Sequence, residues 1–309
     1  MDGRDKPGHD RIVFTLAHLS DPHLAPLPQP HWDQLLSKRV TGYINWRRRR
    51  RFIHDAEALA RIVADVKAHA PDHIAVTGDI ANIALPEEFK RGRAWLENLG
   101  DGSRVSFVPG NHDVYVAEAA LYAARQFYAF MVDDEGVSGF PYVRRRGNVA
   151  LIGVSTGVPT APLLATGWLG ANQLAALAIA LKSLKAEGLF RVVLIHHPPV
   201  TGAARHKRLL DADVFLRVMR AHGAELVLHG HDHRNMLNWM EGPDGRQVPA
   251  VGVPSASALP GVDKDAAAYN LYRIDGERGD WRCELISRAL SGEGEVKERA
   301  RFVLAFPSP

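Results

Sequence analysis

Five short polar clusters, each placed directly after an apolar run, constrain this chain more than any other feature of its sequence. They are Asp21-x-His23, Gly78-Asp79, Gly110-Asn111-His112-Asp113, His196-His197-Pro198 and Gly230-His231-Asp232-His233. The apolar runs before them have the length of short buried strands. In α/β sheets, the loops at the carboxyl ends of parallel strands converge on one crevice. The sequence therefore predicts that the five clusters meet in one site.

The segments between the clusters predict an α/β fold in one domain. Apolar residues recur at helical spacing over residues 55–70, and an Ala- and Leu-rich segment over residues 172–187 ends at a glycine. Residues 248–306 contain four further apolar runs, which predict a mostly antiparallel tail. We expect a disordered lead-in at residues 1–10 and a single domain over residues 11–309, with inserts at about 24–54 and 115–146.

Composition limits both the chemistry and the location of the protein. A single cysteine, Cys283, in 309 residues excludes a disulfide framework, a four-thiolate zinc site and an iron–sulfur cluster. No apolar run reaches the ~18 residues of a membrane span, and the N-terminus lacks the apolar segment of a secretory signal. The net charge of +3 is too small for a surface built around nucleic acid. We expect a cytoplasmic protein in which Cys283 is an inert packing residue.

The side chains of the clusters point to metal chemistry. They offer carboxylate, imidazole and amide groups and no thiolate, a set that suits divalent ions such as Mn²⁺, Fe²⁺ or Zn²⁺. Each cluster alone has a simpler explanation, because Gly78-Asp79 is a common turn and Asp21 could be a cap beside an incidental histidine. Their shared position after five predicted strands favours one metal site over five coincidences.

The succession of clusters resembles the calcineurin-like, binuclear metallophosphoesterases, from Phe14 to about His233. The resemblance implies an α/β fold of two facing mixed β-sheets flanked by helices, a four-layer αββα sandwich. It also implies two divalent ions, with Mn²⁺ as the first expectation and Fe or Zn as alternatives, and phosphoester hydrolysis by a hydroxide that bridges them. A non-catalytic scaffold of the same fold is the alternative, and its expected mark is a substituted ligand.

Carried over by position, the resemblance assigns a role to each cluster. One metal would be held by Asp21, His23, Asp79 and His233. The other would be held by Asp79, Asn111, His196 and His231, with Asp79 bridging the two. His112 would act on the substrate without binding metal, and Asp113 would orient His112.

The remaining histidines are predicted to lie outside the metal set. The side chains of His197 and His229 are expected to point away or to support the ligands; a substrate contact through His197, Arg205 or His206 is the alternative. His18 is expected in the core. Surface positions are predicted for His9, His31, His54, His69, His73 and His222.

Two features bear on the substrate. The His-His-Pro-Pro and Gly-His-Asp-His clusters resemble the bacterial class III cyclic-nucleotide phosphodiesterase branch, which implies 3′,5′-cyclic AMP or another small phosphodiester. Residues 35–52, however, mix apolar and aromatic residues with a basic run of Arg47, Arg48, Arg49, Arg50 and Arg51.

This pattern has three open interpretations. It is typical of an interfacial helix that binds an anionic leaflet, here the inner membrane face. A solvated basic helix face and a nucleic-acid contact are the others. On the membrane interpretation, the substrate would be a lipid-linked pyrophosphate such as UDP-2,3-diacylglucosamine.

Overall fold

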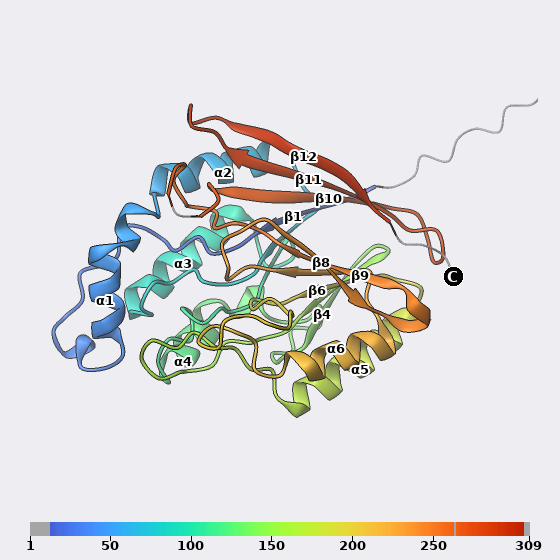
Figure 1. The fold of residues 1–309 in the computed structure, drawn as a ribbon, viewed down its shortest axis with the longest axis horizontal. Helices are drawn as coiled ribbons and strands as arrows, with labels where there is room; N and C mark the ends of the chain where they lie inside the picture. The colour runs from blue at the N-terminus through green and yellow to red at the C-terminus, as the bar shows by residue number, and fades with distance from the viewer. Residues whose placement is uncertain (1–12, 263, 306–309) are drawn as a thin grey trace, which may run out of the picture.

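The computed structural model describes residues 13–262 and 264–305, so the predicted lead-in at residues 1–10 lies outside the described residues. Two six-stranded mixed sheets dominate the fold (Figure 1). The first runs in the order β12 (Val296–Leu304), β11 (Arg282–Leu290), β10 (Ala268–Asp275), β1 (Phe14–Leu19), β2 (His73–Val76) and β3 (Val105–Phe107). The second runs in the order β4 (Tyr142–Arg146), β5 (Val149–Gly153), β6 (Phe190–Leu194), β7 (Leu226–His229), β9 (Gln247–Gly252) and β8 (Met236–Glu241).

Each sheet combines a parallel centre with antiparallel edges. Strands β1, β2 and β3 are parallel, as are β5, β6, β7 and β9. The last three runs of the predicted tail, β10, β11 and β12, pair antiparallel beside β1, as the sequence predicts. The first run is β9, which lies in the second sheet between the parallel β7 and the antiparallel β8. The short η4 turn (Pro243–Gly245) joins β8 to β9. Every strand that precedes a polar cluster therefore belongs to one of the two parallel centres.

Alternation along the strands of the second sheet builds two hydrophobic layers. In β5, Leu151 belongs to the core between the two sheets, while its neighbour Ala150 packs in the cluster of α5 (Ala171–Ala186) and α6 (Ala212–His222). In β6, Val192 and Val193 divide in the same way. Successive side chains of a strand point to opposite faces, so both faces of this sheet are buried.

Helices cover the outer side of each sheet. Helix α2 (Ala56–Ala68) packs on β10 and β11, and Asp55 caps its N-terminus by accepting the Ala58 backbone N–H at 2.8 Å. Helix α3 (Pro86–Leu99) lies beside α4 (Ala119–Gln126), and α5 and α6 cover the second sheet. Figure 1 shows the layers as helix, sheet, sheet and helix, which confirms the predicted αββα sandwich.

The first predicted insert is a helical flank, and the second ends in a strand. Residues 24–54 contain η1 (Asp33–Leu35), α1 (Arg39–Arg48) and η2 (Arg50–Phe52) at the left of Figure 1. Residues 115–146 contain α4, η3 (Tyr128–Phe130) and β4. Because β4 pairs antiparallel with β5, residues 142–146 belong to the second sheet. Within the described part of the chain, no helix is long and apolar enough to cross a membrane.

Candidate metal centre

The polar clusters meet because both parallel centres end at the same edge of the sandwich. Asp21 follows β1 and Asp79 follows β2, and the Asp21 backbone N–H donates to the Gly78 carbonyl at 2.9 Å. From the second sheet, the Gly230 N–H donates to the His196 carbonyl at 3.1 Å. A bridge between Ser20 and Ser255 ties the two sheets together at this edge. The predicted convergence of the clusters is therefore what the fold produces.

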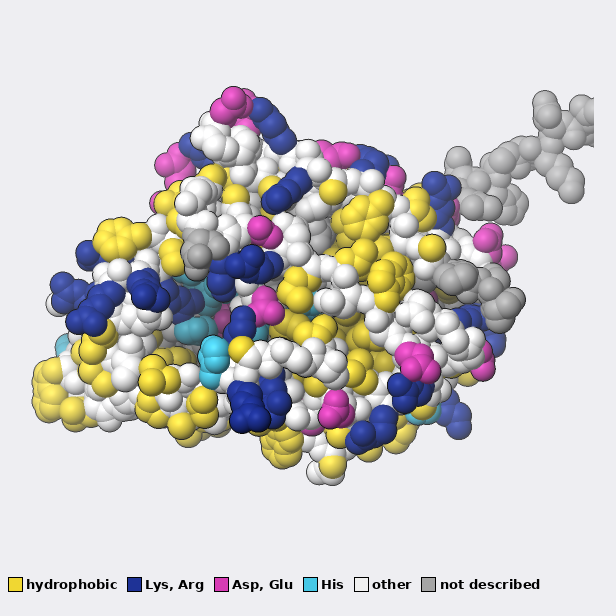
Figure 2. Space-filling model, in the orientation of Figure 1, with side chains coloured by type: hydrophobic (Ala, Val, Ile, Leu, Met, Phe, Trp, Pro, Cys, Tyr) yellow, Lys and Arg dark blue, Asp and Glu magenta, His cyan; other side chains and the backbone are white. Residues whose placement is uncertain are grey.

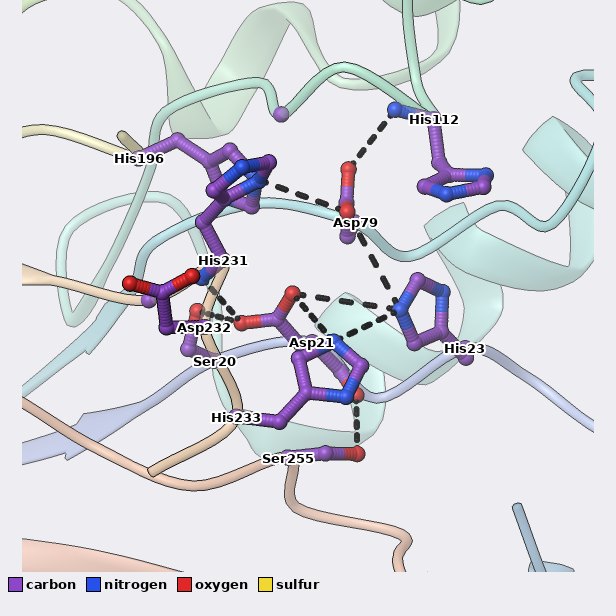
Figure 3. A network of polar contacts seen from close by, with 12 residues as sticks. Ser20, Asp21, His23, Asp79, His112, His196, His231, Asp232, His233 and Ser255 are labelled. Carbon is purple, nitrogen blue, oxygen red and sulfur yellow. Dashed lines mark hydrogen bonds and ion pairs between the residues drawn. The ribbon is translucent and has the colours of Figure 1, made fainter. Parts of the chain in front are cut away.

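The backbone of this edge is strained at the expected ligands. Positive φ values occur at Asp21 (51°), His23 (37°), Asp79 (58°), His231 (69°) and His233 (54°). Non-glycine residues rarely adopt such values, and they persist where the surrounding structure imposes them, often at functional sites. With the backbone in this conformation, the five side chains face one another around a common centre (Figure 3).

Asp21, His23 and His233 form a first group of donors (Figure 3). His233 Nε2 lies 3.0 Å from Asp21 Oδ1 and 3.3 Å from His23 Nε2. His23 Nδ1 lies 3.1 Å from the Ala81 carbonyl, so the N–H on Nδ1 donates there and Nε2 presents its lone pair to the group. A carbonyl partner of this kind fixes the tautomer that a metal-binding imidazole needs.

A second group is built in the same way around His196. His196 Nε2 lies 3.4 Å from Asp79 Oδ2 and 3.3 Å from both Asn111 Oδ1 and His231 Nδ1. The opposite ring nitrogens are held by backbone carbonyls: His196 Nδ1 lies 2.6 Å from Thr77 O, and His231 Nε2 lies 2.8 Å from Lys207 O. Each ring therefore has one nitrogen held by a backbone carbonyl and turns the other towards the Asp79 carboxylate.

Asp79 belongs to both groups. Its Oδ2 lies 3.9 Å from His23 Nε2 and 3.4 Å from His196 Nε2, while Oδ1 accepts the His112 backbone N–H at 2.7 Å (Figure 3). Two nitrogen and oxygen donor sets that share a carboxylate fit two neighbouring divalent cations. The residues present therefore fit the two metals that the sequence predicts.

The charges and burial of the side chains in the centre favour the binding of cations. Burial alone would raise the pKa of Asp21, but the adjacent His233 outweighs burial and holds it well below its usual range. Burial disfavours protonation of His196, yet Asp79 overcomes this and raises the pKa of His196 to about 10. Burial lowers the pKa of His23 well below its usual range, so this imidazole is a neutral donor. The two buried carboxylates thus favour a cationic His196 beside them, and divalent cations would supply the same positive charge.

His112 lies beside the centre, as predicted, but it is held differently. Its Nδ1 is 2.5 Å from the Asn82 carbonyl, and its ring stacks on Tyr115 at 5.4 Å. Burial, followed by the charge of Arg50, lowers the pKa of His112 to about 3. A substrate phosphate beside the ring would oppose that shift, because its negative charge favours the imidazolium.

The predicted role of Asp113 is wrong. Its carboxylate accepts the backbone N–H groups of Asp79 at 2.7 Å and of Ala81 and Gly110 at 2.9 Å each. The described residues show no hydrogen bond between Asp113 and the His112 ring, which the Asn82 carbonyl orients instead. Asp113 shapes the loop that carries Asp79.

Of the candidate substrate contacts, His197 packs against the second donor group, with its ring centroid 4.3 Å from that of His231 and 5.0 Å from that of His196. His197 is buried, and its ring nitrogens lie 2.7 Å from Thr156 Oγ1 and 3.0 Å from the Ala165 carbonyl. Both ring nitrogens are thus engaged by protein groups, which favours the predicted supporting position over a substrate contact. Arg205 and His206 are exposed on the loop after β6, and no hydrogen bond or ion pair found in the described residues joins their side chains to the centre.

Two histidines predicted at the surface are buried. His73 lies inside β2, where its Nε2 is 2.8 Å from Ser106 Oγ. His54 packs against the first donor group, with its ring centroid 4.5 Å from that of His23 and 5.7 Å from that of His233. Candidate ligand atoms of these three histidines lie within 4.8 Å of one another. His18, in contrast, is a core residue, as predicted.

The basic run divides between the surface and the centre. Arg47, Arg48, Arg49 and Arg51 are exposed, whereas Arg50 is half-buried and points to His23 and His112. Figure 2 shows histidine side chains in a hollow flanked by basic side chains, with hydrophobic side chains gathered at the adjacent left edge. Sequence reasoning named Arg50 only as one of five arginines for an anionic contact and placed His54 at the surface, so it missed both as residues of the metal centre. Their signal in the sequence is that they lie four residues apart, with His54 directly before Asp55, the cap of α2.

Comparisons with solved structures support the fold. A dimetal phosphatase from Danio rerio superposes with a TM-score of 0.55 at 15% identity, covering 94% of this chain and 99% of that chain. The purple acid phosphatase PPD1 from yellow lupin seeds gives a TM-score of 0.60 at 12% identity, covering 95% of this chain and 54% of that chain. The chain thus spans about half the length of the lupin enzyme. No curated protein matches this sequence.

The family comparison covers every cluster of the site. Residues 14–235 match the family model for the calcineurin-like phosphoesterases. This range begins at β1 and ends just after His233, so it contains both donor groups and His112. Members of this family hydrolyse phosphoesters at a two-metal centre, and the donor groups that share Asp79 are of that kind. The chain belongs to the calcineurin-like phosphoesterase family.

Proposed function

We propose that this protein hydrolyses a phosphodiester, with 3′,5′-cyclic AMP or a related small diester as the first candidate. The observation that carries the hydrolytic role is the sharing of Asp79 between two buried donor groups with His112 alongside. The cyclic-nucleotide candidate rests on the His196-His197-Pro198-Pro199 and Gly230-His231-Asp232-His233 clusters, which resemble the class III branch.

Each donor group would hold one divalent ion. The first ion would be bound by Asp21, His23 and His233, and the second by Asn111, His196 and His231. Asp79 would bind both ions. Ions held there lower the pKa of water and offset charge on phosphoryl oxygens.

His112 lies next to this centre without belonging to either donor group. Its Nδ1–H donates to the Asn82 carbonyl, so the nitrogen that can serve the substrate is Nε2, which lies 3.1 Å from Arg50 Nη1 in this structure. Nε2 can hold a proton for the leaving oxygen once phosphate binds beside the ring, a contribution of roughly 10²–10⁴-fold in rate.

A substrate panel tests this proposal. The protein is loaded with Mn²⁺ and assayed against cyclic nucleotides, glycerophosphodiesters, UDP-2,3-diacylglucosamine and single-stranded DNA. We expect turnover of a small diester, and a loss of roughly 10²-fold or more in His112→Ala with unchanged metal content. Hydrolysis of none of these by the metal-loaded protein would refute the proposal.

A second candidate function is supported by the surface of the first insert. Trp32, Leu36, Val40 and Ile44 recur every four residues, and their exposed fractions are 76%, 76%, 41% and 44%. The exposed arginines Arg47, Arg48 and Arg51 follow on the same segment. An apolar stripe beside basic residues suits the anionic face of a membrane, where each arginine adds about 1 kcal/mol.

This surface lies beside the metal centre, since Arg50 links the same segment to His23. We therefore propose, as the second candidate, a peripheral enzyme of the inner membrane face that hydrolyses a lipid-linked pyrophosphate such as UDP-2,3-diacylglucosamine. Sedimentation with phosphatidylglycerol vesicles should fall at least tenfold in Leu36→Ser/Ile44→Ser. Ile179→Ser, which removes an exposed apolar residue of α5, is the control. Failure of the intact protein to bind the vesicles would refute this candidate.

A further inference from the structure

One arginine of the basic run reaches the metal centre. Arg50 Nη2 lies 2.6 Å from His23 Nε2, and Nη1 lies 3.0 and 3.1 Å from the two ring nitrogens of His112. The guanidinium therefore lies between a predicted metal ligand and the histidine expected to act on substrate.

The chain fixes this position. The Arg50 carbonyl accepts the backbone N–H groups of Ile53 and His54 at 3.0 Å each, and the Asp55 N–H donates to the Ser257 carbonyl at 2.9 Å. The His54 side chain is buried and its Nδ1 lies 2.9 Å from Ser257 Oγ. The turn that carries Arg50 is thus anchored to the β9–β10 loop rather than free at the surface.

Arg50 also lacks the carboxylate partner that the inward-facing Arg191 and Arg288 have. Arg191 pairs with Glu225 at 2.8 Å and Arg288 with Asp65 at 2.6 Å. In the described part of the chain no carboxylate lies within ion-pair distance of Arg50, whose contacts are two imidazoles. A guanidinium has five N–H donors and matches the geometry of phosphate oxygens. Most of its donor capacity is left for an anion.

Metal binding would turn the free N–H donors of Arg50 away from His23 and towards the substrate side of the centre. The lone pair of His23 Nε2 can serve the Arg50 guanidinium or a divalent cation, but not both. A cation bound at His23 Nε2 would repel the Arg50 guanidinium from His23, while the anchored turn would keep it near His112. That location is where a phosphoryl group must bind if His112 is to reach its leaving oxygen.

We propose that Arg50 binds the non-bridging phosphoryl oxygens of the substrate. The inference rests on the proposed phosphoester hydrolysis, and it applies equally to a cyclic nucleotide and to a lipid-linked pyrophosphate, because both present the same oxyanion. It separates Arg50 from the four exposed arginines of the run, which do not reach the centre.

Inorganic phosphate is the probe that tests this role. Its affinity for the Mn²⁺-loaded protein is measured by titration calorimetry, with metal content by mass spectrometry, for wild type, Arg50→Gln, Arg50→Lys and the exposed control Arg48→Gln. Loss of charge-assisted hydrogen bonds predicts phosphate binding about 10- to 100-fold weaker in Arg50→Gln. Arg50→Lys should recover part of the affinity, and Arg48→Gln should match wild type. Both metals should remain in every variant.

The outcomes separate the two proposals. Unchanged phosphate affinity in Arg50→Gln would overturn the role of Arg50, as would loss of metal from that variant, because Arg50 would then act on the ligands. Arg50-dependent phosphate binding in a protein that hydrolyses no member of the substrate panel would support the binding role and refute the proposed function. In an active enzyme, Arg50→Gln should raise KM for bis-p-nitrophenyl phosphate at least as strongly as it lowers kcat.

Discussion

Replacement of Gly78 by alanine tests how the metal centre is assembled. Gly78 has φ +95°, and a Cβ built on it would lie 2.6 Å from both the Gly110 backbone nitrogen and His196 Nδ1. The first atom is backbone, and the second is held 2.6 Å from the Thr77 carbonyl, so neither can yield without disturbing the centre. Alanine at this position must therefore push apart two of the loops that carry the ligands.

The size of the effect follows from two contributions. A left-handed backbone costs an L-residue about 1–2 kcal/mol, and overpacking adds about 1–3 kcal/mol. We expect Gly78→Ala to lower the free energy of unfolding by about 2–5 kcal/mol in urea titrations. Displacement of His196 should also weaken metal binding by roughly 10- to 100-fold, the effect typical of losing a hydrogen-bond partner that orients a metal ligand.

Gly147 provides the matched control. It lies in the turn between β4 and β5 with φ +59° and nothing within 4 Å of its built Cβ. Gly147→Ala should therefore show the backbone cost alone, about 1–2 kcal/mol, with wild-type metal content. If Gly78→Ala matched Gly147→Ala in both stability and metal content, the close approach of these loops would be refuted.

Three further predictions concern single side chains. His54→Ala should weaken Mn²⁺ binding by roughly 10- to 100-fold in calorimetry because its ring packs on the first donor group, whereas the exposed His69→Ala should not; equal affinities would contradict this. Asp113→Asn should lower metal content as well as turnover, because an amide cannot accept all three backbone N–H groups that bond to Asp113. Full metal content with reduced turnover would contradict this and indicate that Asp113 acts only by orienting His112. Cys283 is fully buried and burial raises the pKa of its thiol, so it should resist a disulfide reagent at pH 8 until urea unfolds the protein; rapid native labelling would contradict its burial.

The fixed order of strands and polar clusters along the sequence was enough to predict that the donor groups meet. Each ligand cluster follows a buried strand, and parallel strands deliver their ends to one edge whatever the lengths of the loops between them. The expected sharing of Asp79 agrees with its distances to His23 and His196. These predictions depend on strand order and donor chemistry, which a sequence displays directly.

The first insert was harder to interpret because its residues follow no single periodicity. In α1, Tyr43 and Trp46 pack against the core while Val40 and Ile44 face solvent, so apolar residues lie on opposing sides. The inward turn of Arg50 depends on backbone bonds at η2, made after α1 has ended. Neither hydrophobic pattern nor charge distinguishes Arg50 from its neighbours.

The positions of His73 and Asp113 show a second limit of prediction from the sequence. His73 lies in a four-residue strand between β1 and β3, too short for its own residues to reveal burial on both faces. Asp113 satisfies backbone N–H groups of two loops, Gly110 in its own and Asp79 and Ala81 in another. Such a role depends on tertiary contacts, and a role carried over by motif position does not include them.

Anomalous scattering from Mn²⁺-loaded crystals tests the central claim most directly. The account predicts two peaks on opposite sides of the Asp79 carboxylate, about 3.5–4 Å apart. One should lie among Asp21, His23 and His233, and the other among Asn111, His196 and His231. Asp79→Ala crystals should show neither peak. A single peak in the wild type, or both peaks in Asp79→Ala, would contradict the shared two-metal centre.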